Sequence, residues 1–228
     1  MVLSGTLSVF LLCSLSLCLR GTEAQDVDQN TLPRIIYHIQ QYSPGPKKQY
    51  AVAINIPAEM CGADFRPDDT FLAGDKPGEV TCYFSKRLIY QSATMIGAVP
   101  KNSYHSEFWL LNPRNPDVSP MKNLLNERKD GCVIFYSYNS PCLGTCLNAT
   151  NTGRNILTAL DMFTRHDGPK AFVYSQIFGI ADAEQYRDDF AKVNAKIRLY
   201  RCTSEAECQA CFNGGAFNQP FCLNNVNL

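Results

Sequence analysis

The stretch CVIFYSYNSPCLGTC, residues 132–146, joins a compact apolar run to a pair of cysteines. Its first part, residues 132–138, is rich in β-branched and aromatic side chains, which predicts a buried central strand. Pro141 has no amide hydrogen to donate and a fixed backbone angle, which favours a helix start directly after this strand. On a helix, Cys142 and Cys146 would face the same side, because positions i and i+4 lie about one turn apart. These two thiols would then either bind a metal or form a disulfide with each other.

The segments around this strand alternate between strand patterns and helix patterns. Further strands are expected at QYAVAINIP (49–57), EVTCYFSKRLIYQ (79–91), KAFVYSQIF (170–178) and KIRLY (196–200). Helices are expected at LPRIIYHIQQY (32–42), SYHSEFWLL (103–111), SPMKNLLNERKDG (119–131, capped by Ser119), TGRNILTALDMFTRHDG (152–168) and 182–194. Strands that alternate with helices predict an α/β protein with helices on both faces of one sheet.

The first 24 residues have the pattern of a signal peptide, with an apolar run at 9–19 followed by small residues. This run is too short to span a membrane as a helix. We therefore expect a secreted, extracellular protein without membrane contact. Its domains are expected at 25–201, for one α/β domain, and at 202–228, for a cysteine-rich C-terminal extension.

The charges of the chain balance, with 21 Lys and Arg residues against 21 Asp and Glu residues. The basic residues are scattered rather than gathered in a stripe, which argues against nucleic-acid binding driven by bulk charge. The oligomeric state stays open.

Nine of the 11 cysteines remain once Cys13 and Cys18 leave with the signal peptide. An oxidising compartment predicts disulfides among them, but an odd number does not decide which ones pair. We expect a bridge between Cys61 and Cys82 and two bridges within the extension, while Cys132 reads as a buried thiol. The four cysteines of the extension are Cys202, Cys208, Cys211 and Cys222.

His105 is the informative one among three histidines, because it begins the sequence His-Ser-Glu with Glu107. Together with Ser-Pro-Cys at residues 140–142, it resembles the His-x-Glu and Pro-Cys signature of zinc-dependent nucleobase deaminases. The resemblance implies that His105, Cys142 and Cys146 bind Zn²⁺ and that Glu107 is the catalytic residue that moves protons. A disulfide between the two cysteines would leave the upstream His-x-Glu unexplained, so we favour zinc.

A wider resemblance, over about residues 50–200, carried by CVIFYSYNSPC and AFVYSQIF, is to the AID/APOBEC cytidine deaminases, and to their secreted relatives in particular. It implies a three-layer cytidine-deaminase-like fold with a five-stranded mixed sheet flanked by helices. It also implies that Ser140 contacts the cytosine amino group through its backbone and that Phe178 helps to bind the base. The chain departs from the family pattern in having three residues, not two, between Cys142 and Cys146.

The expected function is hydrolytic deamination of cytosine to uracil in single-stranded nucleic acid, with a role in immunity. Free cytidine nucleosides or nucleotides are the alternative substrates, and a non-catalytic secreted binding protein with the same fold is the alternative class. Asn148, in Asn-Ala-Thr, is an expected glycosylation site.

Overall fold

The computed structural model describes residues 26–112, 114–179, 183–204 and 206–224. The expected signal peptide, residues 1–24, lies outside the described residues, as do the last four residues of the expected extension.

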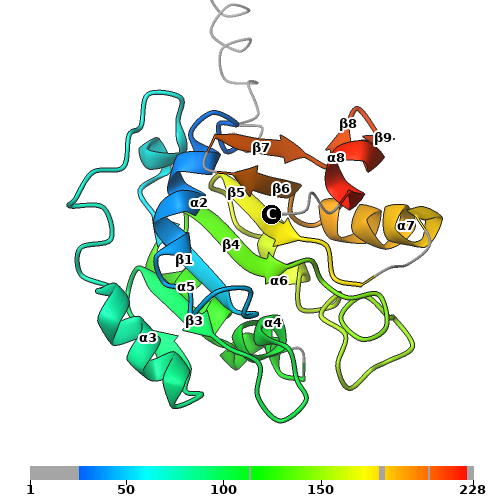
Figure 1. Ribbon diagram of the computed structural model, residues 1–228, viewed down its shortest axis with the longest axis horizontal. Coiled ribbons are helices and arrows are strands. Elements are labelled where there is room, and N and C mark those ends of the chain that lie inside the picture. The colour runs from blue at the N-terminus through cyan, green and yellow to red at the C-terminus, as the bar shows by residue number, and fades with distance from the viewer. Residues whose placement is uncertain (1–25, 113, 180–182, 205, 225–228) are drawn as a thin grey trace, which may run out of the picture.

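A mixed sheet of seven strands, in the order β2-β3-β1-β4-β5-β6-β7, forms the centre of the molecule (Figure 1). The strands are β1 (Ala51–Ile56), β2 (Tyr90–Gln91), β3 (Met95–Ala98), β4 (Cys132–Asn139), β5 (Lys170–Gln176), β6 (Leu199–Ser204) and β7 (Glu207–Ala210). β1 is antiparallel to β3 and β4, whereas β4, β5 and β6 run parallel to one another. The expected central strand at 132–138 is therefore confirmed as β4.

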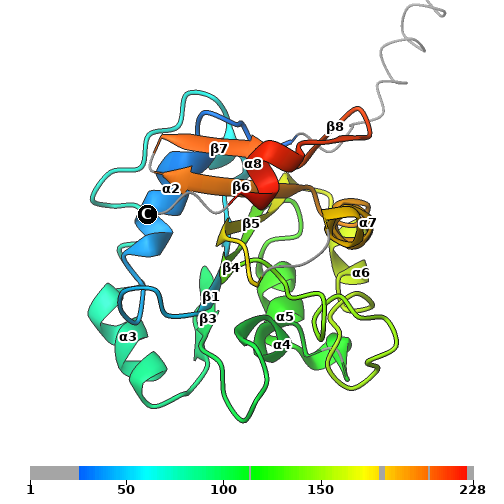
Figure 2. The same cartoon turned by 45° about the vertical axis from the view of Figure 1, so that its right-hand side comes forward.

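Helices cover both faces of this sheet, as the sequence predicts for an α/β protein (Figures 1 and 2). The helices are α2 (Leu32–Gln40), α3 (Pro77–Ser85), α4 (Ser106–Leu111), α5 (Pro120–Glu127), α6 (Asp161–Thr164), α7 (Ala183–Asn194) and α8 (Gln219–Leu223). α2 and α3 pack on the face that carries Val52 and Ile54 of β1, and α4 to α7 pack on the face that carries Ala51 and Ala53. This alternation of buried side chains along one strand divides the core into two halves.

The prediction of five strands is wrong, because the sheet has seven. The single strand expected at 79–91 is also wrong, because most of this segment is helical. Its first part belongs to α3, which begins at Pro77 and turns Val80 and Phe84 into the core. Proline suits the first turn of a helix, and apolar residues four apart share one helix face. β2 and β3 follow as a short hairpin, and β7 supplies the remaining additional strand from the C-terminal segment.

The helix expected at 152–168 is shortened to the four residues of α6. The segment before it is rich in Asn, Thr and Gly and forms turns. Within it, the Asn151 carbonyl accepts from both the backbone amide and the side chain of Asn155, which forms a single turn. Asn, Thr and Gly are poor helix formers, so the helix does not extend through this segment.

The disulfides join Cys61 to Cys132, Cys202 to Cys208, and Cys211 to Cys222. The two expected bridges of the extension are therefore confirmed. The expected bridge from Cys61 to Cys82 is wrong, and so is the buried thiol at Cys132. The strand register explains the difference: Ile56 pairs with Cys132 across β1 and β4, and Cys61 follows only one short turn after β1. Cys82 is exposed and free on α3.

The C-terminal segment packs as part of the same body as the sheet. Beside β7, the Cys211–Cys222 disulfide is buried against the half of the core that contains α7. Arg201, only 1 % exposed, donates hydrogen bonds to the carbonyls of Ser175, Phe221 and Asn224. One buried guanidinium thus ties α8 to β5 and β6. Over the described ranges, no helix has the length and apolar character of a membrane span.

Candidate metal and catalytic site

The residues expected to bind zinc meet where β4 ends and α4 begins. His105 lies directly before α4, in extended backbone, and α4 packs against β1 and β3. β4 pairs with β1, so its end brings Cys142 and Cys146 to the same edge of the sheet. Helix α4 therefore begins at the expected place.

The helix start expected at Cys142 is absent, because residues 143–146 form turns instead. The side chain of Asn148 donates to the Gly144 carbonyl, which a continuing helix would pair with a backbone amide. Glycine also lowers the helix propensity of this segment. The two cysteines are nevertheless brought together, since the turn bonds Leu147 N to the Cys142 carbonyl at 3.0 Å.

The three expected ligands form a compact set that we name the His–Cys–Cys cluster: His105, Cys142 and Cys146. The His105 Nδ1 atom lies 3.2 Å from the Cys146 sulfur and 3.6 Å from the Cys142 sulfur, and all three ligand atoms lie within 4.8 Å of one another. A tetrahedral zinc ion, with Zn–N near 2.0 Å and Zn–S near 2.3 Å, would separate such atoms by about 3.5 Å. Neither cysteine belongs to a disulfide. The donor types and their spacing therefore fit zinc.

The protonation of this cluster favours a thiolate at one of its sulfurs. Hydrogen bonding from Cys146, and then from His105 and Thr145, lowers the pKa of Cys142, while the same contact with Cys142 raises the pKa of Cys146. The hydrogen bond with Cys142 raises the pKa of the His105 imidazole, and the nearby guanidinium of Arg154 opposes that rise. Metal ligands bind in their deprotonated forms, so ion binding would displace the remaining protons.

Glu107 lies beside the cluster without belonging to it. It is only 1 % exposed, and its two carboxylate oxygens accept hydrogen bonds from Ser137, at 2.9 Å, and from Ser106, at 3.1 Å. Burial raises the pKa of this carboxyl. A carboxyl held in one orientation with a raised pKa is suited to accept and return a proton near neutral pH.

A polar network that the sequence analysis did not identify positions Glu107. The Gln49 amide donates to the hydroxyls of Ser106 and Ser137, at 3.0 and 2.9 Å, and these hydroxyls in turn donate to the carboxylate. Gln49 also accepts from the Asn139 amide at the end of β4. Ser106, inside His-Ser-Glu, is the one member of this network whose position in the sequence indicates a role beside Glu107. Gln49 and Ser137 lie 88 positions apart, so no local pattern links them.

The two residues expected to bind the base lie at the same edge of the sheet. The Ser140 amide donates to the Gln176 carbonyl at 2.6 Å, and the Ser140 hydroxyl accepts from the Phe178 amide at 2.9 Å. The Phe178 ring is 47 % exposed, and its centroid lies 5.8 Å from that of the His105 imidazole. The Tyr186 hydroxyl donates to the Phe178 carbonyl, which fixes this segment to α7. An exposed aromatic ring thus stands next to the cluster.

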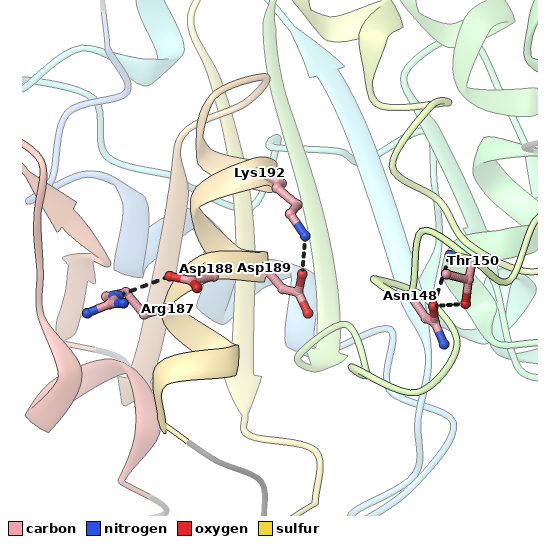
Figure 3. Close-up of polar contacts among 6 residues, drawn as sticks. All are labelled: Asn148, Thr150, Arg187, Asp188, Asp189 and Lys192. Atoms are coloured by element: carbon pink, nitrogen blue, oxygen red, sulfur yellow. Dashed lines mark hydrogen bonds and ion pairs between the residues drawn. The ribbon is translucent and has the colours of Figure 1, made fainter.

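Asn148 is half-buried two residues beyond Cys146, and the next two residues of the sequon, Ala149 and Thr150, are exposed. Its side-chain oxygen accepts hydrogen bonds from the Thr150 amide, at 3.0 Å, and the Thr150 hydroxyl, at 2.7 Å (Figure 3). Figure 3 also shows two ion pairs of α7, the exposed pair of Arg187 with Asp188 and the pair of Lys192 with the buried Asp189.

The structure is that of an α/β protein in which helices cover both faces of a mixed sheet. At one edge of this sheet, one imidazole and two thiols form a candidate metal site beside a buried carboxyl. The family model described as Secreted Novel AID/APOBEC-like Deaminase 1 matches residues 29–226, and the chain belongs to this family. No curated protein and no solved structure gives a significant match. The family name describes secreted proteins, and three disulfides fit an oxidising extracellular compartment.

Proposed function

We propose that this chain is a secreted, zinc-dependent deaminase that hydrolyses cytosine to uracil in single-stranded nucleic acid. The observation that carries the proposal is the position of the buried Glu107 carboxyl beside the His–Cys–Cys cluster. Family membership supports the same chemistry. A role in immunity is proposed with it, from secretion and family resemblance.

His105 Nδ1 and the sulfurs of Cys142 and Cys146 would hold the zinc ion. When bound, zinc supplies a Lewis acid that makes water nucleophilic near neutral pH. Three protein ligands are the usual number for a catalytic zinc site, which keeps one position open.

Glu107 moves the protons of the reaction. Its carboxylate takes a proton from the attacking water and gives it to the ring nitrogen of cytosine, and the second proton of the water leaves with the amine as ammonia. A carbon–oxygen bond replaces the carbon–nitrogen bond at C4 of the base, so water is the only co-reactant. Ser106 and Ser137 keep the carboxylate oriented throughout, since each donates to one of its oxygens.

Ser140 and Phe178 position the base in this proposal. The Ser140 carbonyl accepts from the amino group of cytosine, and the exposed Phe178 ring stacks on the base. The hydrogen bond between Ser140 and Phe178 couples the two contacts.

The test uses the mature protein secreted from eukaryotic cells. We expect about one zinc ion per chain by elemental analysis and conversion of cytosine to uracil by mass spectrometry. His105→Ala should lose both, whereas Cys82→Ser, at an exposed free cysteine, should keep both. Zinc retained without turnover of any cytosine substrate would favour the non-catalytic binding protein. A disulfide between Cys142 and Cys146 in every molecule would refute the zinc site.

Faster turnover of free cytidine than of an oligonucleotide would favour the small-substrate alternative, which the zero net charge also suits. Glycosylation of Asn148 is proposed separately: Asn148→Gln should lower the mass of the secreted protein by one glycan. An unchanged mass would mean that the sequon is unused.

A further inference from the structure

A strained turn places Tyr104 directly before the metal ligand His105. Lys101 and Tyr104 exchange two backbone hydrogen bonds, at 3.1 and 3.0 Å, across a turn whose central residues are Asn102 and Ser103. Both central residues have left-handed backbone, with φ of 52° and 62°. This conformation is uncommon for residues other than glycine and is concentrated at functional sites. The turn therefore fixes the backbone of Tyr104 directly before His105, and the Tyr104 ring packs against Phe108 and Trp109 of α4.

Two arginines from separate segments converge on this ring. The Arg114 guanidinium carbon lies 5.3 Å from the ring centroid, and its Nη2 atom donates to the Tyr104 hydroxyl at 2.6 Å. The Arg154 guanidinium carbon lies 5.0 Å from the same centroid. Arg114 returns to the ring because Asn112, in left-handed backbone with φ of 43°, ends α4 and reverses the chain. Three segments thus meet at one aromatic side chain.

The two guanidinium groups form a local excess of positive charge. Both side chains are exposed, and neither takes part in the salt bridges found among the described residues. Arg154 is close enough to His105 for its charge to act on the imidazole. Glu107, whose charge also acts on His105, is buried and accepts hydrogen bonds from Ser106 and Ser137. Two exposed guanidinium groups over the Tyr104 ring are therefore available to bind an anion.

Phosphate is the anion that this arrangement suits. The planar guanidinium fork matches phosphate oxygens in pairs, and stacking on an aromatic ring limits the orientations of that fork before binding. A Tyr104 hydroxyl that accepts from Arg114 keeps its own hydrogen available for a further acceptor. The Phe178 ring, the proposed partner of the base, has its centroid 5.8 Å from that of the His105 imidazole. The charge of Arg154 also acts on this imidazole, so a cytosine that carries a phosphate on its sugar would find both groups near His105.

We propose that Tyr104, Arg114 and Arg154 form a phosphate-binding subsite, so that the substrate is a phosphate-bearing cytosine compound rather than the free nucleoside. This inference rests on the proposed deaminase function. The phosphate can belong to a nucleotide or to a nucleic-acid strand. The zero net charge of the chain is compatible with either, because the subsite is local.

The test compares kcat/KM for cytidine, cytidine monophosphate and a short single-stranded oligonucleotide with one cytosine. The wild-type protein should prefer one of the phosphorylated substrates to cytidine by at least about tenfold. Arg114→Gln and Arg154→Gln should each lower this preference ratio by about tenfold. Arg66→Gln removes an equally exposed arginine at the opposite end of β1 and should leave the ratio unchanged. A ratio that the Arg114 and Arg154 variants do not lower would overturn the subsite.

The salt dependence separates the two phosphate sources. Preference for the oligonucleotide should fall steeply as salt rises, whereas preference for the monophosphate should fall less, because a strand releases more counterions.

The phosphate-binding subsite can be tested even if the protein is not a deaminase. If no cytosine compound is turned over, titration calorimetry on the zinc-loaded protein still compares binding of the monophosphate with binding of cytidine. Tighter binding of the monophosphate that both arginine variants lose would support the subsite, and equal binding of the two ligands would overturn it.

Discussion

Replacing Glu107 with glutamine separates proton transfer from every other property of the site. Glutamine has almost the same shape, so its side-chain oxygen can still accept from Ser137 and its amide can donate to the Ser106 hydroxyl. The His–Cys–Cys cluster is untouched, and zinc content should stay at the wild-type level. The substitution removes the ability to carry a proton and the charge of the ionised carboxylate.

Two effects of opposite sign are expected from Glu107→Gln. The turnover number should fall by about 10²- to 10⁴-fold, the usual contribution of a general acid–base, which corresponds to about 3–5 kcal/mol in the barrier. Above the raised pKa of Glu107, the metal-free variant should be more stable than the wild type, since a neutral side chain then replaces a buried ion. A gain of 1 kcal/mol would raise the melting temperature by about 2–4 °C for a chain of this size.

The pH dependence checks the sign of the stability effect. Burial raises the pKa of Glu107 above its unfolded value, so the folded state binds this proton more tightly than the unfolded state. Wild-type stability from this group is therefore full below the unfolded pKa, falls as pH rises toward the folded pKa, and is constant above it. The stability difference between the variant and the wild type should accordingly be small near pH 4 and largest above the raised pKa.

The measurements are zinc content, initial deamination rate, and urea unfolding of chelator-treated protein across this pH range. Glu79→Gln neutralises an exposed carboxylate on α3 and should change none of the three. A Glu107→Gln protein that holds zinc and keeps more than a tenth of the wild-type rate would refute the proton-carrier role.

Three further predictions concern the disulfides, the C-terminal segment and the metal. The double variant Cys61→Ala with Cys132→Ala opens a disulfide of sequence separation 71, which should lower the free energy of unfolding in urea by about 4 kcal/mol. The control Cys82→Ser should leave this free energy unchanged. Equal losses in the two variants would mean that the disulfide is wrongly assigned. Arg201→Ala removes hydrogen bonds to three backbone carbonyls. It should lower the free energy of unfolding by about 3 kcal/mol and make residues near α8 susceptible to proteolysis. A variant that is as stable as the wild type and is not cleaved would contradict this role of Arg201. Zinc affinity, measured by chelator competition, should weaken as pH falls from 8 to 6, because the His–Cys–Cys cluster must release protons to bind the ion. A zinc affinity that does not change with pH would count against thiolate ligands.

Much of the central architecture follows from local patterns. The apolar run at 132–138 becomes β4, Ser119 accepts from the Lys122 amide as the N-cap of α5, and α4 begins directly after His105. Each of these features depends on neighbours in the chain, such as β-branched runs, capping hydroxyls and proline at a first turn. Patterns of this kind can be recognised in the sequence without knowledge of the tertiary contacts.

The strand predicted at 79–91 is a helix in the structure, and the difference has a physical reason. Residues 79–91 are rich in β-branched and aromatic side chains, yet α3 forms there because Val80 and Phe84 find a sheet face to cover. Strand propensity is a weak preference that burial overrides. The same burial turns Cys82 toward solvent and leaves Cys61 beside Cys132.

In the candidate site, too, some residues can be recognised from the sequence and others only from the tertiary structure. His105, Glu107, Cys142 and Cys146 are recognisable in the chain, because metal and proton chemistry demand particular residue types at short spacings. The residues that support and surround them are not recognisable in this way. Gln49 reaches Ser137 only through the pairing of β1 with β4. Arg114 and Arg154 reach Tyr104 through the turns at the end of α4 and after Cys146. The reacting groups can thus be read from the amino-acid order, whereas the contacts that orient them and select a substrate depend on long-range packing, which no local pattern encodes.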